Sequence, residues 1–510
     1  MELSLIRDRL SYAENIFSET HTTEEAMEMI VPDAMPDILR IVSADAMVLT
    51  RSKDTSTERV TIAGAATVSV IYAPDGEIGL RRVNLELPFR ISAEGGRITP
   101  SSSATVRLLP VTVSAIALNP RKISARVNIA AEISCFEEIE LEIPTSIAPL
   151  DCDCIEVLSG EMEVLVPVEV LEKTFIASCE YQIPQSNPPM GDILRTSVSL
   201  EPQEVKVVGS KLIFKGTTTV SILYSGADSG EVTACSFDTE YSQIIELENA
   251  NAESEFVIIP LLTGAYIENG SMTDAEGRRF AAELHIAAQC VASSKMKLRY
   301  ISDAYSSKFV LETAREALLL CGAPAARSVP AVLRAVLEAS ELSRVVSVSA
   351  RPGAPVSTAD DGEFKLTTPV EIEALYVAND GTVRTASGRF SAESVIADTG
   401  REVLNAAAKC SGEVYGAPSD GGIEVRVPIE MTAYKPTIYE CTHISGISLD
   451  EETPLDLAAL PSLVIARVSS DDSLWTLAKR HYSTCELILR ANELDGDAEL
   501  PGVLVIPKKR

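Results

Sequence analysis

The sequence TIAGAATVSVIYAPDGE (Thr61–Glu77) decides the fold, because related segments occur twice more in the chain. They are IFKGTTTVSILYSGADSGE (Ile213–Glu231) and KLTTPVEIEALYVANDGT (Lys365–Thr382). In each segment, apolar residues alternate with polar ones up to a tyrosine, and a short turn rich in Gly and Asp follows. The three tyrosines are separated by two equal intervals and are Tyr72, Tyr224 and Tyr376. An internal repeat of this kind predicts three related modules.

Each repeated segment has the pattern of a β-hairpin. In the first one, Ile62, Val68 and Tyr72 share one face, while Thr61 and Thr67 lie on the other. Period two with β-branched side chains is typical of a half-buried strand. Asp-Gly dipeptides follow at 75–76 and 380–381, and glycine accepts the positive φ that a hairpin turn requires. A calcium-binding loop is the alternative for these turns, but the ligand spacing of such a loop does not follow.

A second motif recurs upstream of the first two hairpins. VPDAMPDILRIV (Val31–Val42) matches NPPMGDILRTSV (Asn187–Val198), and SVPAVLRAVLEAS (Ser328–Ser340) is a weaker counterpart. The residues shared by the first two copies include Asp37, Ile38, Asp192 and Ile193. Two interpretations stay open. In one, the apolar residues cover the end of a barrel or sandwich and Asp caps the turn; in the other, the motif is a surface for self-recognition.

These patterns predict a mainly β protein with three tandem β-sandwich or barrel-like modules at residues 1–175, 176–325 and 326–448. Units of this length are large enough to bury a core of their own. The third module is the most diverged, and residues 308–320 and 332–342 could form short helices instead of strands. A linker at residues 449–463 then leads to a small α+β domain at residues 464–510.

The C-terminal domain is predicted to have the order strand, helix, helix, strand. Its sequence is LVIARVSSDDSLWTLAKRHYSTCELILRANELDGDAELPGVLVIPKK. Asp471 or Asp472 is expected to cap the first helix, where a negative charge is favourable. Ser483 and Glu486 have the spacing of a capping box for the second helix.

This domain resembles a LysM domain in Asp472-Ser473-Leu474-Trp475, Ala478-Lys479-Arg480, Asn492, Pro501-Gly502 and Leu504-x-Ile506-Pro507. The resemblance implies two helices on one side of a two-stranded sheet. It also implies a groove for glycans that contain N-acetylglucosamine, between the loops at residues 470–474 and 492–497. The implied groove residues are Asp471, Asp472, Ser473, Leu474, Trp475, Asn492, Glu493, Leu494 and Asp495.

The groove departs from the LysM pattern in its charge. Asp471 stands where the family usually has glycine, and Asp497 and Glu499 add acids to the second loop. A bulkier and more acidic groove favours a protein partner over a glycan. Trp475, the single Trp of the chain, has two interpretations: it packs the first helix on the LysM sheet, or it contacts a partner as a binding hot spot.

The three modules together with the LysM-like end resemble SipL-type proteins, which carry SPOCS domains. The matching segments are VPDAMPDILRI, the strands that end in Tyr72 and Tyr224, and ISDAYSSKF (Ile301–Phe309). The resemblance implies a role in spore coat morphogenesis, in the mother-cell cytoplasm at the forespore surface. It also implies association with the coat-morphogenetic ATPase that polymerises on that surface.

Composition excludes several other classes of protein. The chain has 510 residues and a formal net charge of −30, which argues against binding to nucleic acid or anionic lipid. Its N-terminus lacks the pattern of a secretory signal, and no stretch approaches the roughly 20 apolar residues of a membrane helix. The ten Cys are scattered and are expected to be small buried residues in a reducing cytosol. Cys152-x-Cys154 is only a weak metal signal.

An enzyme would need a constellation of reactive side chains, and the sequence does not contain one. It has no nucleophile elbow and no phosphate-binding loop, and His21, His285, His443 and His481 lie far apart in the chain. The acids at 137, 138 and 140 alternate with apolar residues and indicate a solvated strand face. We therefore expect a non-enzymatic adaptor without metal or cofactor. The alternative is a peptidoglycan-binding protein of the spore envelope. Exposed strand edges also allow homo-oligomers.

Overall fold

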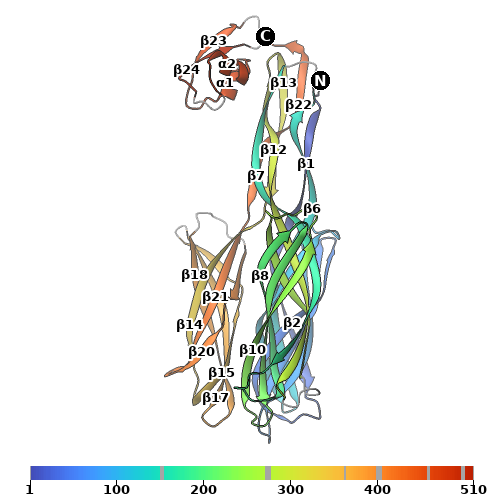
Figure 1. Ribbon diagram of the computed structural model, residues 1–510, viewed down its shortest axis with the longest axis vertical. Helices are drawn as coiled ribbons and strands as arrows, with labels where there is room; N and C mark the ends of the chain where they lie inside the picture. The colour runs from blue at the N-terminus through green and yellow to red at the C-terminus, as the bar shows by residue number, and fades with distance from the viewer. Residues whose placement is uncertain are drawn as a thin grey trace.

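A computed structural model describes residues 2–149, 154–269, 277–360, 363–397, 405–456, 460–495 and 500–508. Within these residues the chain is mainly β, with two short helices close to the C-terminus, and none of the described sheets closes into a barrel (Figure 1). The predicted fold class is confirmed. The molecule is elongated: β-sandwiches form its lower part, a stalk of long strands rises above them, and the helical domain lies at the tip of the stalk (Figure 1).

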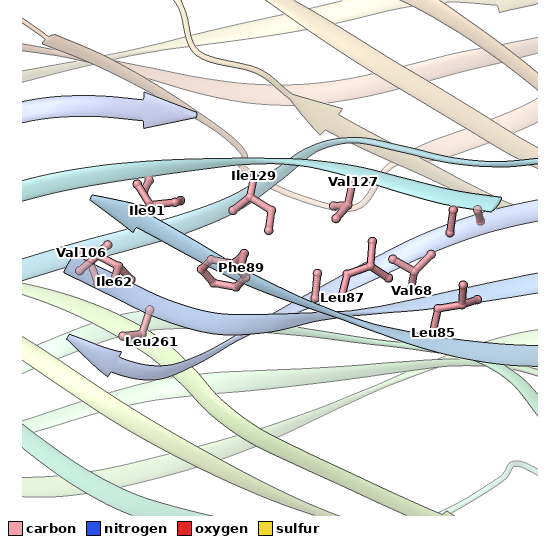
Figure 2. Packing of buried hydrophobic residues seen from close by; sticks show 14 of the residues in the cluster. Ile62, Val68, Leu85, Leu87, Phe89, Ile91, Val106, Val127, Ile129 and Leu261 are labelled. Carbon is pink, nitrogen blue, oxygen red and sulfur yellow. The ribbon is translucent and has the colours of Figure 1, made fainter. Parts of the chain in front are cut away.

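The first repeat is a sandwich of two three-stranded antiparallel sheets. One sheet has the order β1-β6-β5, and the other has the order β2-β3-β4. The strands are β1 (Leu5–Ile30), β2 (Ile38–Ser56), β3 (Arg59–Pro74), β4 (Arg81–Glu94), β5 (Ser103–Asn119) and β6 (Lys122–Ile147). Figure 2 shows the core between the sheets, where Ile62 and Phe89 face Ile129. Leu261 of the second repeat belongs to the same core, so the first two repeats are packed together.

The second repeat has the same order of strands. Its sheets are β7-β12-β11 and β8-β9-β10. The strands are β7 (Ile155–Gln182), β8 (Met190–Val208), β9 (Lys211–Gly226), β10 (Val232–Glu246), β11 (Glu255–Asn269) and β12 (Arg279–Ser306). The boundary proposed between residues 175 and 176 lies inside β7, which pairs with β12 along its length.

The third repeat keeps the hairpin but has shorter outer strands. One sheet contains β15 (Leu342–Pro352), β16 (Val356–Asp360), β17 (Glu363–Ala378) and β18 (Val383–Ala397). The other contains β14 (Ala325–Leu337), β19 (Asn405–Cys410), β20 (Tyr415–Ser419) and β21 (Gly422–Lys435).

The alternative helices at residues 308–320 and 332–342 are wrong. The first segment forms β13 (Phe309–Cys321), which pairs with β22 (Ile438–Pro454). Most of the second belongs to β14, which pairs with β21 residue by residue. Both segments are rich in Ala, Leu and Glu, so their intrinsic helix propensity is high. Backbone pairing with a neighbouring strand outweighs that propensity, because propensity is a weak preference that tertiary context overrides.

Three two-stranded ribbons form the stalk. They are the outer parts of the β1–β6 and β7–β12 pairs together with β13–β22 (Figure 1). Leu10, Val164, Leu298, Leu320 and Cys441 fill the space between the ribbons. In the third repeat the ribbon is separate from the sandwich, because Pro324 and Pro436 interrupt strands that continue in the other repeats. Proline lacks the N–H that a central strand must donate.

The three repeats also meet in a shared apolar cluster at equivalent positions. Ile71, Leu223 and Leu375, which precede the repeated tyrosines, are all buried in this cluster. Val42, Leu194 and Val346 join it, each from a point where the strand register slips by one residue. Within each set of three, successive residues are 152 positions apart in the sequence. The side of the strand that faces away from the sandwich core therefore holds the three repeats together.

A buried polar cluster lies beside this apolar one. Arg195 of the second repeat donates to Ser43 Oγ (3.4 Å) and to Ser347 Oγ (3.3 Å), which are its equivalents in the other two repeats. It also pairs with Glu373 at 3.3 Å. Arg351 of the third repeat pairs with Asp45 of the first at 2.7 Å. Charges from all three repeats thus compensate one another at the junction.

Candidate binding site

The C-terminal domain has the predicted strand–helix–helix–strand order. It consists of β23 (Leu463–Arg467), α1 (Leu474–Arg480), α2 (Cys485–Ala491) and β24 (Val503–Pro507). The two strands pair antiparallel. Its core contains Leu477, Ala478, Ile488, Leu504 and Ile506, all fully buried. The helices therefore lie on the sheet as the LysM resemblance implies.

The residues predicted to cap the two helices, Asp471 or Asp472 and Ser483, are not the caps. Ser473 caps α1 in a capping box with Thr476, and Thr484 caps α2 by accepting from Leu487 N at 3.1 Å. Asp472 is not the cap, because its carboxylate accepts from Ser469 N (3.1 Å) and pairs with Arg480 (2.8 Å). Ser483 is not a cap either, since its hydroxyl donates to the Pro507 carbonyl.

The side-chain amide of Asn492, predicted as a groove residue, makes its hydrogen bonds within the domain. Its Nδ2 donates to Ile488 O and to Val505 O, both at 2.7 Å, and its Oδ1 accepts from Val505 N at 2.8 Å. The side chain therefore ties α2 to β24. Asp472 and Ser473 are engaged in the caps and turns described above. Three of the polar groups expected to bind a sugar are thus used internally.

The remaining predicted groove residues divide into apolar and acidic ones. Leu474 and Leu494 are half-buried against the domain core. Asp471, Glu493 and Asp495 are exposed, and we refer to these three residues as the acidic rim. Asp497 and Glu499 lie outside the described residues. The exposed polar surface of the two groove loops is therefore anionic in the part of the domain that the structure describes.

Trp475 packs against the cluster that forms the core of its own domain, and it also contacts the stalk. Its Nε1 donates to Asp303 Oδ2 at 2.8 Å, and its ring meets the Tyr305 ring edge-on with centroids 4.8 Å apart. Lys479, one turn later on α1, donates to both carboxylate oxygens of Asp303, at 2.8 and 2.7 Å. The contact with the stalk is additional to the packing role expected for Trp475, and its contact with a partner stays a prediction.

Tyr305 completes this docking contact. Its hydroxyl donates to Ser483 O at 2.8 Å, and the side chain is only 5% exposed because it joins the core of the C-terminal domain. Arg315 of β13 donates to Asp303 Oδ1 at 2.6 Å and holds the carboxylate from the stalk side. Burial alone would raise the pKa of Asp303, but hydrogen bonds from Lys479 and Trp475 lower it overall.

Sequence reasoning did not predict this contact. It singled out ISDAYSSKF, which contains Asp303 and Tyr305, only as part of a family resemblance. The usable signal is the combination of a single Trp, a Lys one helical turn later, and an Asp-x-Tyr at the end of a long strand.

The tyrosines of the hairpin repeat are structural. Tyr72 Oη donates to Pro36 O at 3.1 Å, and Tyr224 Oη donates to Pro188 O at 2.9 Å. Burial raises the pKa of both hydroxyls. Tyr376 is buried in the core of the third repeat. All three tyrosines are therefore buried within their own repeats.

The Asp-Ile-Leu-Arg residues that the first two repeats share do not lie at equivalent positions of the fold. Ile193 lies opposite Tyr224, whereas Ile41, and not Ile38, lies opposite Tyr72. Matching Asp37 and Ile38 to Asp192 and Ile193 is therefore wrong by three residues. Pairing with the strand that ends in the tyrosine, and not residue identity, therefore defines which positions are equivalent.

An arginine clamp holds the turn that carries the prolines. Arg121 donates to the carbonyls of Val31 and Met35, and it pairs with Asp37 at 3.0 Å. Arg278 holds the same turn in the second repeat, donating to Pro184 O and Asn187 O. Asp37 thus pairs with an arginine and does not cap the turn alone.

The reactive side chains do not assemble into a catalytic or metal site in the part of the chain that is described. No group of three or more His, Cys, Asp or Glu there has the geometry to hold a metal ion. Eight described cysteines are free, Cys154 is disulfide-bonded, and Cys152 lies outside the described residues. Burial raises the pKa of Cys135 and Cys410 to about 11, which disfavours the nucleophilic thiolate.

A cavity of about 230 Å³ lies between the first two repeats. Lys53 lines it and pairs with Glu172 at 2.7 Å, and the Gln289 amide bonds to both backbone groups of Val106. Its charges and amide are therefore satisfied by the protein. Among the described residues, neither helix is long and apolar enough to span a bilayer.

Comparison with known families gives two matches. Residues 189–263 match the family model of the SipL, SPOCS domain, and residues 466–501 match the LysM domain. The first match begins at the start of β8 and ends within β11. No curated protein and no solved structure matches the chain significantly. The predicted combination of a SipL-type SPOCS domain with a C-terminal LysM domain is confirmed. Both families are non-catalytic binding domains, and together they indicate a sporulation-related protein with a module of the glycan-binding class.

Proposed function

From these two domains we propose that the protein is a non-enzymatic adaptor of spore coat assembly. In this proposal it works in the mother-cell cytoplasm and docks the coat-morphogenetic ATPase at the forespore surface. The LysM domain acts as a protein-interaction module. The SipL-type match supports the sporulation role, and the chemistry of the LysM loops supports a protein ligand.

This proposal rests on the hydrogen bonds that the polar residues of the predicted glycan groove make within the domain. Asp472, Ser473 and Asn492 are bonded within the domain, so their polar groups are not free to bind sugar hydroxyls. The exposed acidic rim offers carboxylates instead. Carboxylates attract a basic protein segment, and such charge pairs contribute to the rate and specificity of association.

The net charge of −30 supports the same kind of partner. A large surplus of one sign keeps a protein soluble and speeds its encounter with a surface of opposite sign. Because exposed charges are screened within about 10 Å at 0.1 M salt, we expect the complex with the ATPase to weaken as the salt concentration rises.

We further propose that the chain consists of SPOCS-like modules at residues 1–175, 176–325 and 326–448, a linker at 449–463 and the LysM domain at 464–510. The two-sheet sandwich found in each repeat supports three modules. The exact bounds differ from the strands, because β7, β14, β22 and β23 cross the boundaries after residues 175, 325, 448 and 463, and β22 extends into the proposed linker. Exposed strand edges of the sandwiches are the surfaces through which copies of the chain would pair.

Binding to peptidoglycan glycans is the second candidate, and the LysM match at residues 466–501 favours it. Titration of the full-length chain with chito-oligosaccharide and with purified peptidoglycan fragments, followed by calorimetry, separates the two candidates. Our proposal predicts millimolar or weaker binding. Tight binding to either glycan would favour the spore-envelope role instead.

A pull-down from sporulating cells tests the adaptor function itself. The full-length chain is compared with variants that lack one repeat each or the LysM domain. We expect the ATPase among the captured proteins, and we expect it to be lost with the LysM domain. Capture that is independent of the LysM domain would contradict the docking role.

A further inference from the structure

The docking contact between the LysM domain and β12 has the composition of a ligand-binding site. The LysM side presents an indole N–H and an aromatic face from Trp475, an ammonium from Lys479 and a backbone carbonyl from Ser483. Each of these groups meets a complementary group on the stalk: the Asp303 carboxylate, the Tyr305 ring and the Tyr305 hydroxyl. Charge-assisted hydrogen bonds and edge-on aromatic pairs of this kind give both affinity and geometric selectivity.

We propose that this face of the LysM domain is a recognition site for an extended segment with the sequence Asp-x-Tyr. The chain fills the site in cis with its own Asp303 and Tyr305. The site is distinct from the acidic rim, so the proposal does not depend on docking of the ATPase at that rim.

The spacing of the two stalk residues explains why the ligand is a strand. Successive side chains of a strand point to opposite faces, so residues at i and i+2 point the same way. Asp303 and Tyr305 lie opposite Leu158 and Glu156 of β7 and follow a shift in register after Ile301. Both side chains thus reach the LysM domain from one side of β12. A helix would place residues two apart on different faces.

The stalk residues of the contact, Asp303 and Tyr305, are largely buried. The Asp303 side chain is 17% exposed and the Tyr305 residue 5%. Hydrogen bonds from the indole N–H, from Lys479 and from Arg315 compensate the charge of the buried carboxylate. Losing any one donor from the LysM side leaves part of this charge unpaired, which is costly in a partly desolvated site.

The short connection keeps the segment and the site together. Residues 455–462 join the end of β22 to the start of β23, so an undocked LysM domain stays near the stalk. A tethered ligand acts at a high effective concentration. An external Asp-x-Tyr segment would therefore bind only after the cis contact is weakened.

Trp475, as the single Trp, gives a direct readout of the site in the full-length protein. We compare the wild type with Asp303→Ala and Lys479→Gln, which change opposite sides of the contact, and with Asp495→Ala as the control. In the first two variants we expect emission to shift to the red and acrylamide quenching to rise about twofold, because the indole loses its partners and meets water. The control should behave as the wild type.

A peptide then tests recognition itself. We add RYISDAYSSKF, the sequence of residues 299–309, and a version with Ala in place of Asp. The unchanged peptide should restore protection of Trp475 in the Asp303→Ala chain but leave the wild type unaffected, because its site is filled. Unchanged quenching in both site variants would overturn the docking contact. An Asp303→Ala chain that ignores the peptide, or accepts both versions equally, would overturn recognition of Asp-x-Tyr.

Discussion

Trp475 Nε1 donates a hydrogen bond to Asp303 Oδ2 at 2.8 Å, across 172 positions of the sequence. This bond joins the first turn of α1 to the end of β12. Together with the Tyr305 hydroxyl bond to Ser483 O, it fixes the LysM domain on the tip of the stalk. The domain is therefore presented in one orientation, with the acidic rim left exposed.

The docking contact should depend on pH through Asp303. Its pKa is lowered in the folded protein, so its contribution is fully present above the ordinary aspartate pKa and is lost as pH falls through the lowered value. We expect quenching of Trp475 to stay constant down to the ordinary aspartate range and to rise only below it.

Asp303→Ala provides the control for this titration. It has no carboxylate at position 303, the group whose pKa is lowered, so its quenching should already be raised at neutral pH and should show no further rise in the acidic range. A rise with the same pH midpoint in the wild type and in this variant would argue against Asp303 as the titrating group.

Gly64 is expected to be intolerant of any side chain. A Cβ there would lie 2.2 Å from Leu49 O and 2.6 Å from the Phe89 ring. Overpacking of a core costs about 1–3 kcal/mol, so Gly64→Ala should lower the midpoint of thermal unfolding. Gly96→Ala is the control, because a Cβ there meets nothing within 4 Å. Equal midpoints for the two variants would contradict the packing of β3 on β2 and β4.

The polar junction should be sensitive to loss of Asp45. This carboxylate pairs with Arg351 at 2.7 Å and approaches Arg195 at 3.8 Å, with both arginines largely buried. Removing one partner of a buried pair costs about 3–5 kcal/mol. Asp45→Ala should therefore loosen the third repeat and make it more accessible to limited proteolysis.

Glu94→Gln is the matched control for this change. Glu94 pairs with Arg59 at 2.8 Å on an exposed surface, where an ion pair contributes only about 0–1 kcal/mol. Its proteolysis pattern should equal that of the wild type. If the proteolysis pattern of Asp45→Ala also equalled that of the wild type, the conclusion that the polar junction holds the repeats together would be wrong.

The repeat and the LysM topology could be predicted from the sequence because both rest on local patterns. Period two up to Tyr72, Tyr224 and Tyr376 encodes strands directly. The apolar spacing around Leu477 and Ile488 encodes the two helices. The residues that precede the tyrosines, such as Ile71, carried no visible signal for their role, since a strand pattern does not show which neighbour covers its second face.

The remaining features depend on contacts between distant segments. The shared Asp-Ile-Leu-Arg residues suggested an alignment of the repeats that differs by three residues from the strand register, in which Val42 and Leu194 are equivalent. Ser473 caps the first helix in place of the predicted Asp471 or Asp472, and the Asp472 carboxylate pairs with Arg480 instead. The contact of Trp475 with Asp303 joins two domains, and no local pattern specifies such a pair.

Docking of the ATPase through the acidic rim can be tested by charge reversal in the full-length chain. One variant carries Asp471→Lys, Glu493→Lys and Asp495→Lys. The control carries Glu138→Lys, Glu140→Lys and Glu142→Lys on the exposed face of β6. Both variants change the net charge equally. Binding of each to the purified coat ATPase is then measured at two salt concentrations.

The rim variant should bind the ATPase at least about tenfold more weakly than the wild type, a loss of about 1.4 kcal/mol. The stalk variant should keep wild-type affinity, and only complexes with an intact rim should weaken as salt rises. A rim variant that binds like the wild type, or a stalk variant that is weakened to the same extent, would contradict docking through the LysM domain.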